Sequence, residues 1–173
     1  MDGSKTLVLG GTRSGKSRFA FEQGEKFPGK KVFVATCQPF DSEMKGRIAL
    51  HQQSRNASWK TVEEFFNLAD RIKEISEPYK VILVDCLTLW LSNWVLKEDQ
   101  DTKVREEIFR LLEAVQQTVT PIILVTNEIG MGIVPPTPLG RRFRDLQGEL
   151  NQAAARMVDE VYLVTAGIPL KIK

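Results

Sequence analysis

The sequence predicts a three-layer α/β sandwich, in which helices cover both faces of a mostly parallel sheet of about seven strands. Apolar runs without polar alternation, such as residues 81–84 and 122–125, are typical of strands buried on both faces. Stretches with apolar residues three and four positions apart, as in amphipathic helices, separate most of these runs. A glycine-rich segment at residues 10–17 joins the first apolar run to a helical stretch, as the first βα turn of such a fold does.

The strand-like runs follow one another along the whole chain. Only Ala166 and Gly167 separate the last two, so we expect a hairpin that makes the far edge of the sheet antiparallel. The expected strands cover residues 6–10, 32–36, 58–62, 80–85, 121–126, 160–165 and 168–172.

The expected helices lie between these strands. One begins at about Lys16, and another follows the second strand, where Asp41 or Ser42 can cap it. Apolar residues at helical spacing predict two more, within residues 65–75 and 104–119.

A further helix, at residues 86–96, is apolar nearly all round. A helix of this kind is buried in the core or in a subunit contact. Trp90 and Trp94 within it could form an oligomer interface or line a pocket for a large apolar ligand, and the sequence does not choose between these roles.

Composition limits the class of protein. A chain of 173 residues is most simply one domain, residues 1–173, and its hydrophobic fraction of 42% and charged fraction of 27% are those of ordinary globular proteins. The net charge of +2 does not call for nucleic acid or an acidic membrane surface as a partner. The apolar runs are too short to span a membrane, and the first residues lead directly into a strand without a signal peptide. Cys37 and Cys86 form no disulfide pattern, so we expect reduced thiols and a cytoplasmic location.

Residues 10–17 fit the phosphate-binding pattern G-x-x-x-x-G-K-[ST] (Walker A) at every fixed position. Glycines allow successive backbone N–H groups to converge on phosphate oxygens, and the N-terminus of the following helix adds further donors. In such a P-loop, Lys16 reaches the β- and γ-phosphates and the Ser17 hydroxyl binds Mg²⁺. The predicted phosphate-binding residues are Gly10, Gly11, Thr12, Arg13, Ser14, Gly15, Lys16 and Ser17.

The sequence patterns of other nucleotide-binding proteins do not match this segment. The dinucleotide-binding pattern needs a glycine where Thr12 stands, and the protein-kinase motifs are missing. Asp85, at the end of an apolar strand, predicts the second half of a P-loop NTPase site, which holds Mg²⁺ directly or through water. A GTPase switch is disfavoured, because residues 127–130 read Asn-Glu-Ile-Gly instead of Asn-Lys-x-Asp and Thr88 stands where the switch glycine belongs.

His51 is the only histidine of the chain and a candidate for chemistry. On the helix expected after the second strand it shares one face with Glu43 and Arg47, and the polar segment 52–56 follows it. The carboxyl end of that strand should lie near the phosphate loop, where doubly wound sheets bind ligands.

Three other polar features have open roles. Glu63 and Glu64 could contact a ribose or base edge, or could begin the next helix. The loop at residues 126–136 could be a mobile wall of the substrate site or a plain long loop. Three arginines on the following helix could face phosphate or solvent: Arg141, Arg142 and Arg144.

Several segments together carry a family resemblance. They are residues 10–17; Ala35-Thr36-Cys37-Gln38 with Asp41, Glu43 and Met44; Arg47-Ile48 with His51; Trp59 with Glu63; and Val125-Thr126-Asn127-Glu128 with Gly130-Met131-Gly132-Ile133-Val134-Pro135. They resemble the bifunctional adenosylcobinamide kinase/adenosylcobinamide-phosphate guanylyltransferases of cobalamin biosynthesis (the CobU family). The resemblance covers nearly the whole chain, and the Asn-Glu-x-Gly-Met-Gly loop is its most specific part.

The resemblance implies two reactions. An NTP (ATP or GTP) phosphorylates the aminopropanol hydroxyl of adenosylcobinamide, and a GMP unit from GTP then passes to that phosphate, which releases pyrophosphate and gives adenosylcobinamide-GDP. A histidine matched by His51 attacks the α-phosphorus and carries GMP covalently, which splits one difficult transfer into two easier ones. Leu50 stands where some members have a second histidine. The resemblance also implies a RecA-type fold and a homotrimer, with the Trp90/Trp94 helix and the last strands as interface candidates.

The family's site residues carry over position by position. Lys16 and His51 are the catalytic candidates, and Asp85 matches an acidic metal position with Ser17 as its partner for Mg²⁺. Besides residues 10–17 and Asp85, the positions that match nucleotide contacts are Thr36, Cys37, Gln38, Gln52, Gln53, Ser54, Arg55 and Glu63.

Two other functions remain alternatives. A monofunctional P-loop small-molecule kinase would use Lys16, Ser17 and Asp85 and leave His51 without a role. A regulatory nucleotide-binding ATPase would give a conformational change instead of a product, although the short chain carries no appended recognition domain. The preferred phosphate donor and the order of the two reactions do not follow from the sequence.

Overall fold

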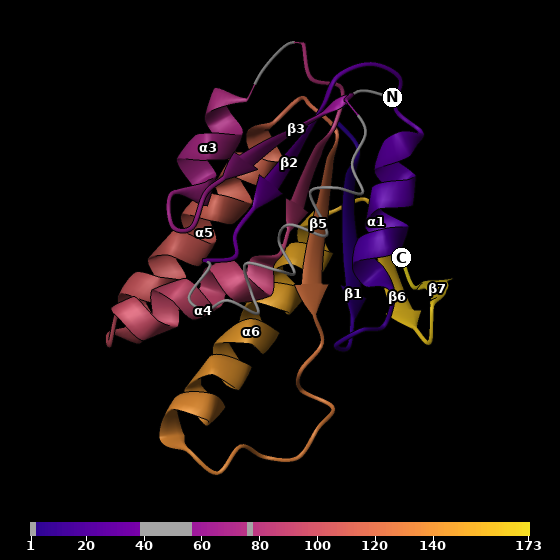
Figure 1. Ribbon diagram of the computed structural model, residues 1–173. Helices are drawn as coiled ribbons and strands as arrows, with labels where there is room; N and C mark the ends of the chain where they lie inside the picture. Colours follow the sequence, from indigo (N-terminus) through magenta and orange to yellow (C-terminus); the bar gives the residue numbers. More distant parts are fainter. Residues whose placement is uncertain (1–2, 39–56, 76–77) are drawn as a thin grey trace.

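A computed structural model describes residues 3–38, 57–75 and 78–173. Seven strands form one sheet in the order β3-β2-β4-β5-β1-β6-β7, parallel throughout except for the β6–β7 pair (Figure 1). This confirms the mostly parallel sheet with an antiparallel edge. The strands are β1 (Lys5–Gly10), β2 (Lys31–Ala35), β3 (Trp59–Glu63), β4 (Ile82–Asp85), β5 (Ile122–Asn127), β6 (Glu160–Thr165) and β7 (Ile168–Lys171).

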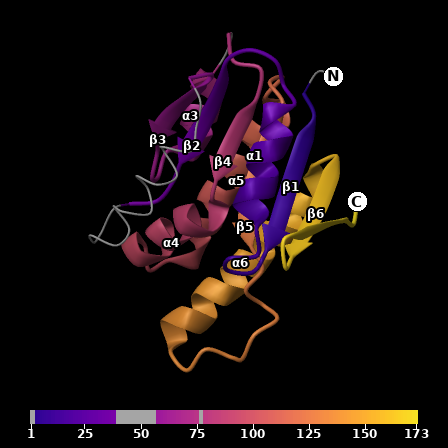
Figure 2. The ribbon, with the colours of Figure 1, turned by 45° about the vertical axis from the view of Figure 1, so that its right-hand side comes forward.

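Helices cover both faces of this sheet, so the predicted three layers are present. In Figure 2 helix α1 lies on one face, and the other described helices, α3 to α6, pack on the opposite face. The described helices are α1 (Lys16–Glu25), α3 (Leu68–Glu74), α4 (Leu87–Lys97), α5 (Asp101–Gln117) and α6 (Pro138–Met157).

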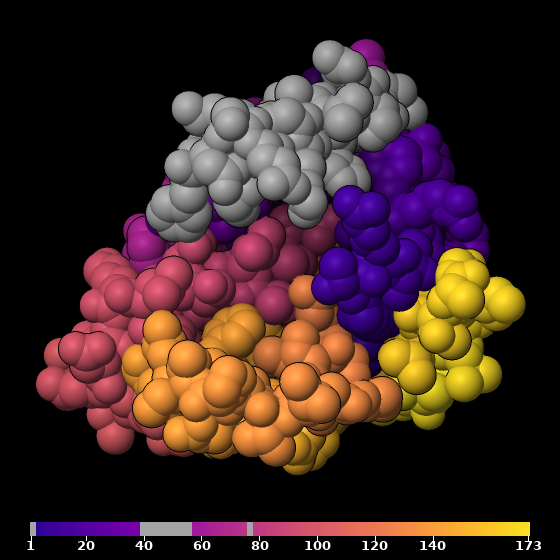
Figure 3. Space-filling model, turned by 60° about the horizontal axis from the view of Figure 1, so that its bottom comes forward, coloured from indigo at the N-terminus to yellow at the C-terminus, as the bar shows by residue number. Residues whose placement is uncertain are grey.

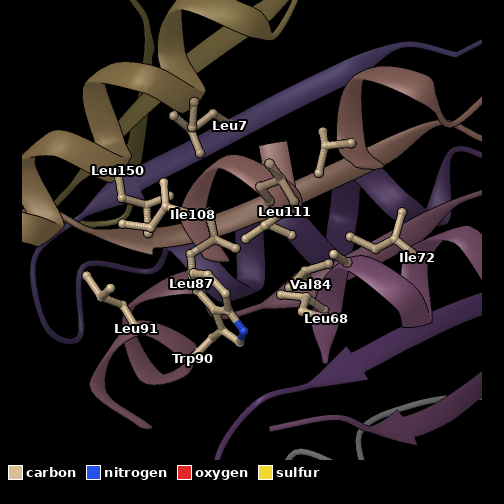
Figure 4. Close-up of a cluster of buried hydrophobic side chains, with 14 of the residues drawn as sticks. Leu7, Leu68, Ile72, Val84, Leu87, Trp90, Leu91, Ile108, Leu111 and Leu150 are labelled. Atoms are coloured by element: carbon tan, nitrogen blue, oxygen red, sulfur yellow. The ribbon is translucent and has the colours of Figure 1, made fainter. Parts of the chain in front are cut away.

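Side chains alternate across the sheet and build a core on each face. Ile122 and Leu124 of β5 join the larger core with Leu87, Leu111 and others from α3 to α6 (Figure 4). Ile123 and Val125 join the smaller core against α1. This alternation determines which residues at the strand ends face the α1 side.

Two expected helices have other bounds than predicted: α3 is shorter, and α5 begins three residues earlier and ends two residues earlier. α3 begins at Leu68 instead of near residue 65, because the Glu64 carboxylate accepts hydrogen bonds from the N–H groups of Phe66 and Asn67 and holds a turn there. α5 ends at Gln117 because Thr118 is extended, which leaves Val119 81% exposed.

The edge hairpin forms as the sequence predicts. Ala166 and Gly167 adopt φ values of 51° and 80°, and left-handed values at both turn residues are typical of a tight hairpin turn between twisted strands. The turn also touches the glycine-rich loop, since the Gly167 N–H donates to the Ser14 carbonyl at 2.8 Å. Among the described segments, no helix has the length and apolar character needed to cross a membrane.

Candidate active site

The segment 10–15 forms a tight loop between β1 and α1 at the carboxyl end of the sheet. A Cβ on Gly10 would lie 2.4 Å from the Ser14 hydroxyl oxygen and 2.5 Å from the Val164 carbonyl oxygen, so only glycine fits there. Gly15 has a φ of 95°, in the left-handed region that glycine adopts readily, and precedes the first residue of α1. The loop therefore presents backbone N–H groups and a helix N-terminus at one place, as phosphate binding requires. Figure 3 looks onto this end of the molecule, with the indigo N-terminal segments between the orange β5–α6 region and the yellow β6–β7 hairpin.

The Lys16 side chain folds back over this loop. Its ammonium group donates to the Gly11 carbonyl at 3.1 Å, and the residue is only 9% exposed. A charge held at the loop in this way is placed to meet phosphate oxygens that bind to the same backbone.

Asp85 lies at the carboxyl end of β4. In register it is opposite Val125 of β5, and β5 in turn pairs with β1, so one strand separates Asp85 from the phosphate-loop strand. Leu83 belongs to the core under α1, and alternation places Asp85 on the same face. The Asp85 carboxylate raises the pKa of the neighbouring Cys86 thiol, and the Lys16 ammonium lowers it.

Cys86 is an inert group at this position. Burial, followed by the negative charge of Asp85, raises the pKa of its thiol to about 12. The thiol is therefore neutral at physiological pH and unsuited to nucleophilic attack, since the thiolate is the reactive form.

The three residues that follow β2 differ in accessibility. Thr36 is fully buried, and its hydroxyl bridges the Cys86 peptide by donating to the carbonyl at 2.6 Å and accepting from the N–H at 2.8 Å. The expected nucleotide contact is therefore not available to the Thr36 side chain, which instead joins the ends of β2 and β4. Cys37 and Gln38 are partly exposed at the same end of the sheet.

Buried polar side chains support the end of β5, and sequence reasoning did not find them. Thr126 accepts a hydrogen bond from Gln147 at 2.9 Å and donates to Asn151 at 2.8 Å, with Thr88 at 3.3 Å from the same hydroxyl. All four are buried. The available signal was the pair of amide residues four apart on α6, on the face that also carries Leu146 and Leu150.

The two glutamates after the Trp59 strand have separate roles. Glu64 forms the turn that precedes α3, as described above. Glu63 is exposed at the end of β3, which is the edge strand four positions from β1. Sheet spacing puts these strands about 19 Å apart, so Glu63 lies well away from the phosphate loop itself.

The three arginines near the start of α6 are mainly structural. Arg142 donates to the Val95 and Glu98 carbonyls at 3.1 and 2.6 Å and pairs with Asp101 at 2.6 Å, so it joins the end of α4 to the start of α5. Arg141 donates to the carbonyls of Pro135 and Pro136, and Arg144 lies 3.7 Å from Asp145.

Trp90 belongs to the core of the chain itself. It is 1% exposed, and its indole N–H donates to the Phe66 carbonyl at 3.0 Å. Trp94 is half-buried, donates to the same carbonyl at 3.2 Å and packs edge-on against the Phe66 ring. The pair therefore anchors the segment before α3.

The predicted contributions of the segment 39–56 lie outside the described residues. These are His51 with the polar residues Gln52, Gln53, Ser54 and Arg55, together with the capping residues Asp41 and Ser42.

The residues at the loop fit a magnesium ion that is bound together with a nucleotide. Mg²⁺ in phosphoryl-transfer sites keeps several waters and phosphate oxygens and takes one or two protein oxygens. The Ser17 hydroxyl at the start of α1 and the Asp85 carboxylate are such donors, and both residues are partly exposed. The described part of the chain holds no cluster of three or more His, Cys, Asp or Glu side chains, as a resident protein-only metal site would need.

A cavity of about 1320 Å³ lies at the other end of the sheet. Ser4, Lys80 and Pro121, which precede strands β1, β4 and β5, are among its lining residues. It is separated from the phosphate loop by the length of the strands and takes no part in the site.

Comparison with known proteins decides the family. A family model described as "Cobinamide kinase / cobinamide phosphate guanyltransferase" matches residues 6–172. The chain belongs to this family. The family is one of transferases in cobalamin biosynthesis, so the predicted resemblance and enzyme class are confirmed.

Curated members of the family match this chain over nearly its whole length. The bifunctional adenosylcobalamin biosynthesis protein CobP of Pseudomonas aeruginosa is 41% identical over 169 residues, which cover 98% of this chain and 97% of that protein. The proteins named CobU of Escherichia coli and Salmonella typhimurium are 38% and 40% identical, and each match covers 96% of this chain and 98% of the relative.

A solved structure supports the fold. The KaiC-like protein PH0186 of Pyrococcus horikoshii superposes with a TM-score of 0.52 at 16% identity, over 94% of this chain and 71% of that chain. This likeness is consistent with the expected RecA-like P-loop fold.

Proposed function

We propose that this chain catalyses two successive transfers on one phosphate loop. In the first, the γ-phosphoryl group of ATP or GTP passes to the hydroxyl of adenosylcobinamide. In the second, GMP from GTP passes to the resulting phosphate, with release of pyrophosphate and formation of adenosylcobinamide-GDP. The observation that carries the proposal is a glycine loop with Lys16 folded over it and Asp85 at a strand end one strand away, in a member of this family.

In the first transfer the protein acts by positioning and by charge. The N–H groups of residues 10–17 hold the β- and γ-phosphates, and Lys16 offsets the negative charge that develops on the transferred group. Ser17 and Asp85 would hold Mg²⁺, which when bound neutralises phosphate charge.

In the second transfer His51 is the proposed nucleophile. A neutral imidazole nitrogen attacks the α-phosphorus of GTP and forms an N–P bond, while the bond to the β-phosphate oxygen breaks and pyrophosphate leaves with the electron pair. A phosphate oxygen of adenosylcobinamide phosphate then attacks the same phosphorus, and the N–P bond breaks. The neutral Cys86 thiol offers no alternative nucleophile.

The remaining nucleotide contacts are proposed for exposed positions at the same end of the sheet. Cys37, Gln38 and the segment 52–55 would contact the ribose and base. Glu63, about 19 Å from the β1 strand by sheet spacing, would contact the far end of an extended nucleotide.

The assembly and setting are also proposals. We propose one domain over residues 1–173, a homotrimer and a cytoplasmic location, with no nucleic-acid partner. The exposed apolar residues Ile168, Leu170 and Ile172 at the β7 edge support a subunit contact there. The net charge of +2 gives no general attraction to nucleic acid.

Product analysis tests the two transfers separately. With Mg²⁺, ATP and adenosylcobinamide, the expected product is adenosylcobinamide phosphate, and later addition of GTP is expected to convert it to adenosylcobinamide-GDP. Mass spectrometry of the corrinoids distinguishes the outcomes. A phosphate that GTP does not convert would indicate the monofunctional kinase, and nucleotide hydrolysis without either product would indicate the regulatory ATPase.

A further inference from the structure

The side-chain oxygen of Asn127 is buried and has no hydrogen-bond partner among the described residues, although the residue as a whole is only half-buried. Its Oδ1 oxygen is shielded from solvent and accepts no hydrogen bond within the described part of the chain. Buried polar atoms in proteins are nearly always hydrogen-bonded, so an orphaned one needs an explanation.

Asn127 occupies a particular place in the sheet. It is the last residue of β5, the strand between β1 with its phosphate loop and β4 with Asp85. In register it lies opposite Gly10, and the next N–H along the chain, that of Glu128, donates to the Gly10 carbonyl at 3.1 Å. Val125 faces the α1 core and Thr126 contacts α6, so alternation places the Asn127 side chain on the α1 face, where the phosphate loop begins.

The backbone of Asn127 is held from two helices. β4 ends opposite Val125, so β5 extends two residues beyond its neighbour and loses the ladder bonds on that side. Two buried side chains replace them: Thr88 of α4 accepts from the Asn127 N–H at 2.7 Å, and Asn151 of α6 donates to its carbonyl at 3.0 Å. We call Thr88 and Asn151 the Asn127 clamp. Gln147 and Thr126 donate hydrogen bonds to Asn151, so this part of the clamp is itself held in place.

We infer that Asn127 is a catalytic residue of the phosphoryl-transfer step and that Thr88 and Asn151 are its positioning residues. The inference rests on the proposed function, because the ligand of the orphaned amide is the reacting group above the phosphate loop. The amide bears two N–H donors and one acceptor, and rotation about its last bond exchanges them. The N–H donates to an oxygen of the γ-phosphoryl group, and the oxygen accepts from the hydroxyl that attacks it.

Such a contact acts mainly in the transition state. The hydroxyl oxygen forms the new P–O bond while the bond to the β-phosphate oxygen breaks, the nucleoside diphosphate leaves with the electron pair, and the hydroxyl proton passes to a phosphate oxygen of the product. A fixed amide that touches both partners aligns them without binding the ground-state nucleotide strongly. Removal of the side chain should therefore lower kcat far more than it weakens nucleotide binding.

The test compares Asn127→Ala with the exposed Asn67→Ala as a matched control. We expect kcat for phosphorylation of adenosylcobinamide to fall by about 10²-fold in Asn127→Ala, the effect of losing one preorganised contact. The dissociation constant of a non-hydrolysable ATP analogue should change less than about threefold, since ground-state binding uses the loop. The melting temperature should fall little, because the side-chain oxygen accepts no hydrogen bond from the described residues that the substitution would remove. A kcat within about twofold of wild type, or a fall matched by equal loss of analogue binding, would overturn the inference.

A double-variant cycle tests the clamp. If Asn151 acts through Asn127, Asn151→Ala lowers kcat by about tenfold in the wild-type background but by less than about twofold in the Asn127→Ala background. Equal effects in both backgrounds would show a purely structural Asn151. If the wild-type protein itself fails to phosphorylate adenosylcobinamide, the proposed function fails first, and the two failures are thus distinguishable.

Discussion

Substitution of Lys16 by methionine is expected to lower kcat/KM for phosphorylation of adenosylcobinamide by about 10³-fold. The ammonium group is held over the phosphate loop by the Gly11 carbonyl at 3.1 Å, and the residue is nearly buried, so the substitution removes a positive charge at the loop itself. Methionine keeps the length and packing of the side chain and removes only the charge and its donors. Steady-state kinetics with each nucleotide measure the loss.

Lys60→Met is the matched control for this substitution. Lys60 is exposed on the edge strand β3, away from the phosphate loop, and its substitution should leave kcat/KM unchanged. The melting temperature of the Lys16 variant should stay close to that of wild type, because one hydrogen bond contributes only about 1 kcal/mol. Activity within tenfold of wild type in Lys16→Met would show that the catalytic charge comes from elsewhere.

Gly10→Ala is expected to weaken nucleotide binding by about thirtyfold. The added methyl would lie 2.5 Å from the Val164 carbonyl oxygen, which belongs to the backbone of β6 and is in register with Gly10 itself. Rotation of the Ser14 side chain could relieve the clash of the methyl group with the Ser14 hydroxyl. Strand β6, however, cannot move away without breaking its hydrogen bonds to β1. We expect a loss of stability of about 1–3 kcal/mol from overpacking. If the displaced loop also loses about 2 kcal/mol of phosphate contacts, affinity falls about thirtyfold.

Gly148→Ala provides the control for the glycine substitution. Gly148 lies within α6, and a Cβ there would meet nothing within 4 Å. The same chemical change should therefore leave nucleotide binding intact and stabilise the protein by about 0.5–1 kcal/mol, since alanine favours helix. Calorimetric titration with the ATP analogue and thermal unfolding of both variants check the pair. Wild-type affinity in Gly10→Ala would contradict the loop geometry.

Local chemistry made much of the fold predictable. The runs 81–84 and 122–125 place apolar side chains on both faces of a strand, and such a strand is stable where helices cover both faces of the sheet. These runs form strands at the centre of the sheet. Only Ala166 and Gly167 separate the last two strands, so the edge hairpin followed from the length of this connection. The glycine loop was predictable because the spacing of Gly10, Gly15, Lys16 and Ser17 is typical of a phosphate-binding loop between a strand and a helix.

The supporting contacts of the site were not predictable, because they join residues far apart in the chain. Thr36 is bound to the Cys86 peptide 50 residues away, and this contact exists only because the ends of β2 and β4 are neighbours. The clamp on Asn127 likewise depends on β5 extending past β4, a difference in strand length that apolar runs do not fix to the residue. Glu64 moved the start of a predicted helix from about residue 65 to Leu68, through side-chain-to-backbone bonds that compete with helical pairing.

The covalent GMP–histidine is the central claim, and intact mass measures it most directly. The purified protein is incubated with Mg²⁺ and GTP labelled at the α-phosphate, then denatured and weighed beside His51→Ala. The account predicts a mass gain of one GMP in the wild-type protein, labile in acid as a phosphoramidate is, and none in the variant. Absence of the adduct under conditions in which adenosylcobinamide is still phosphorylated would contradict the role of His51 and leave a simple kinase.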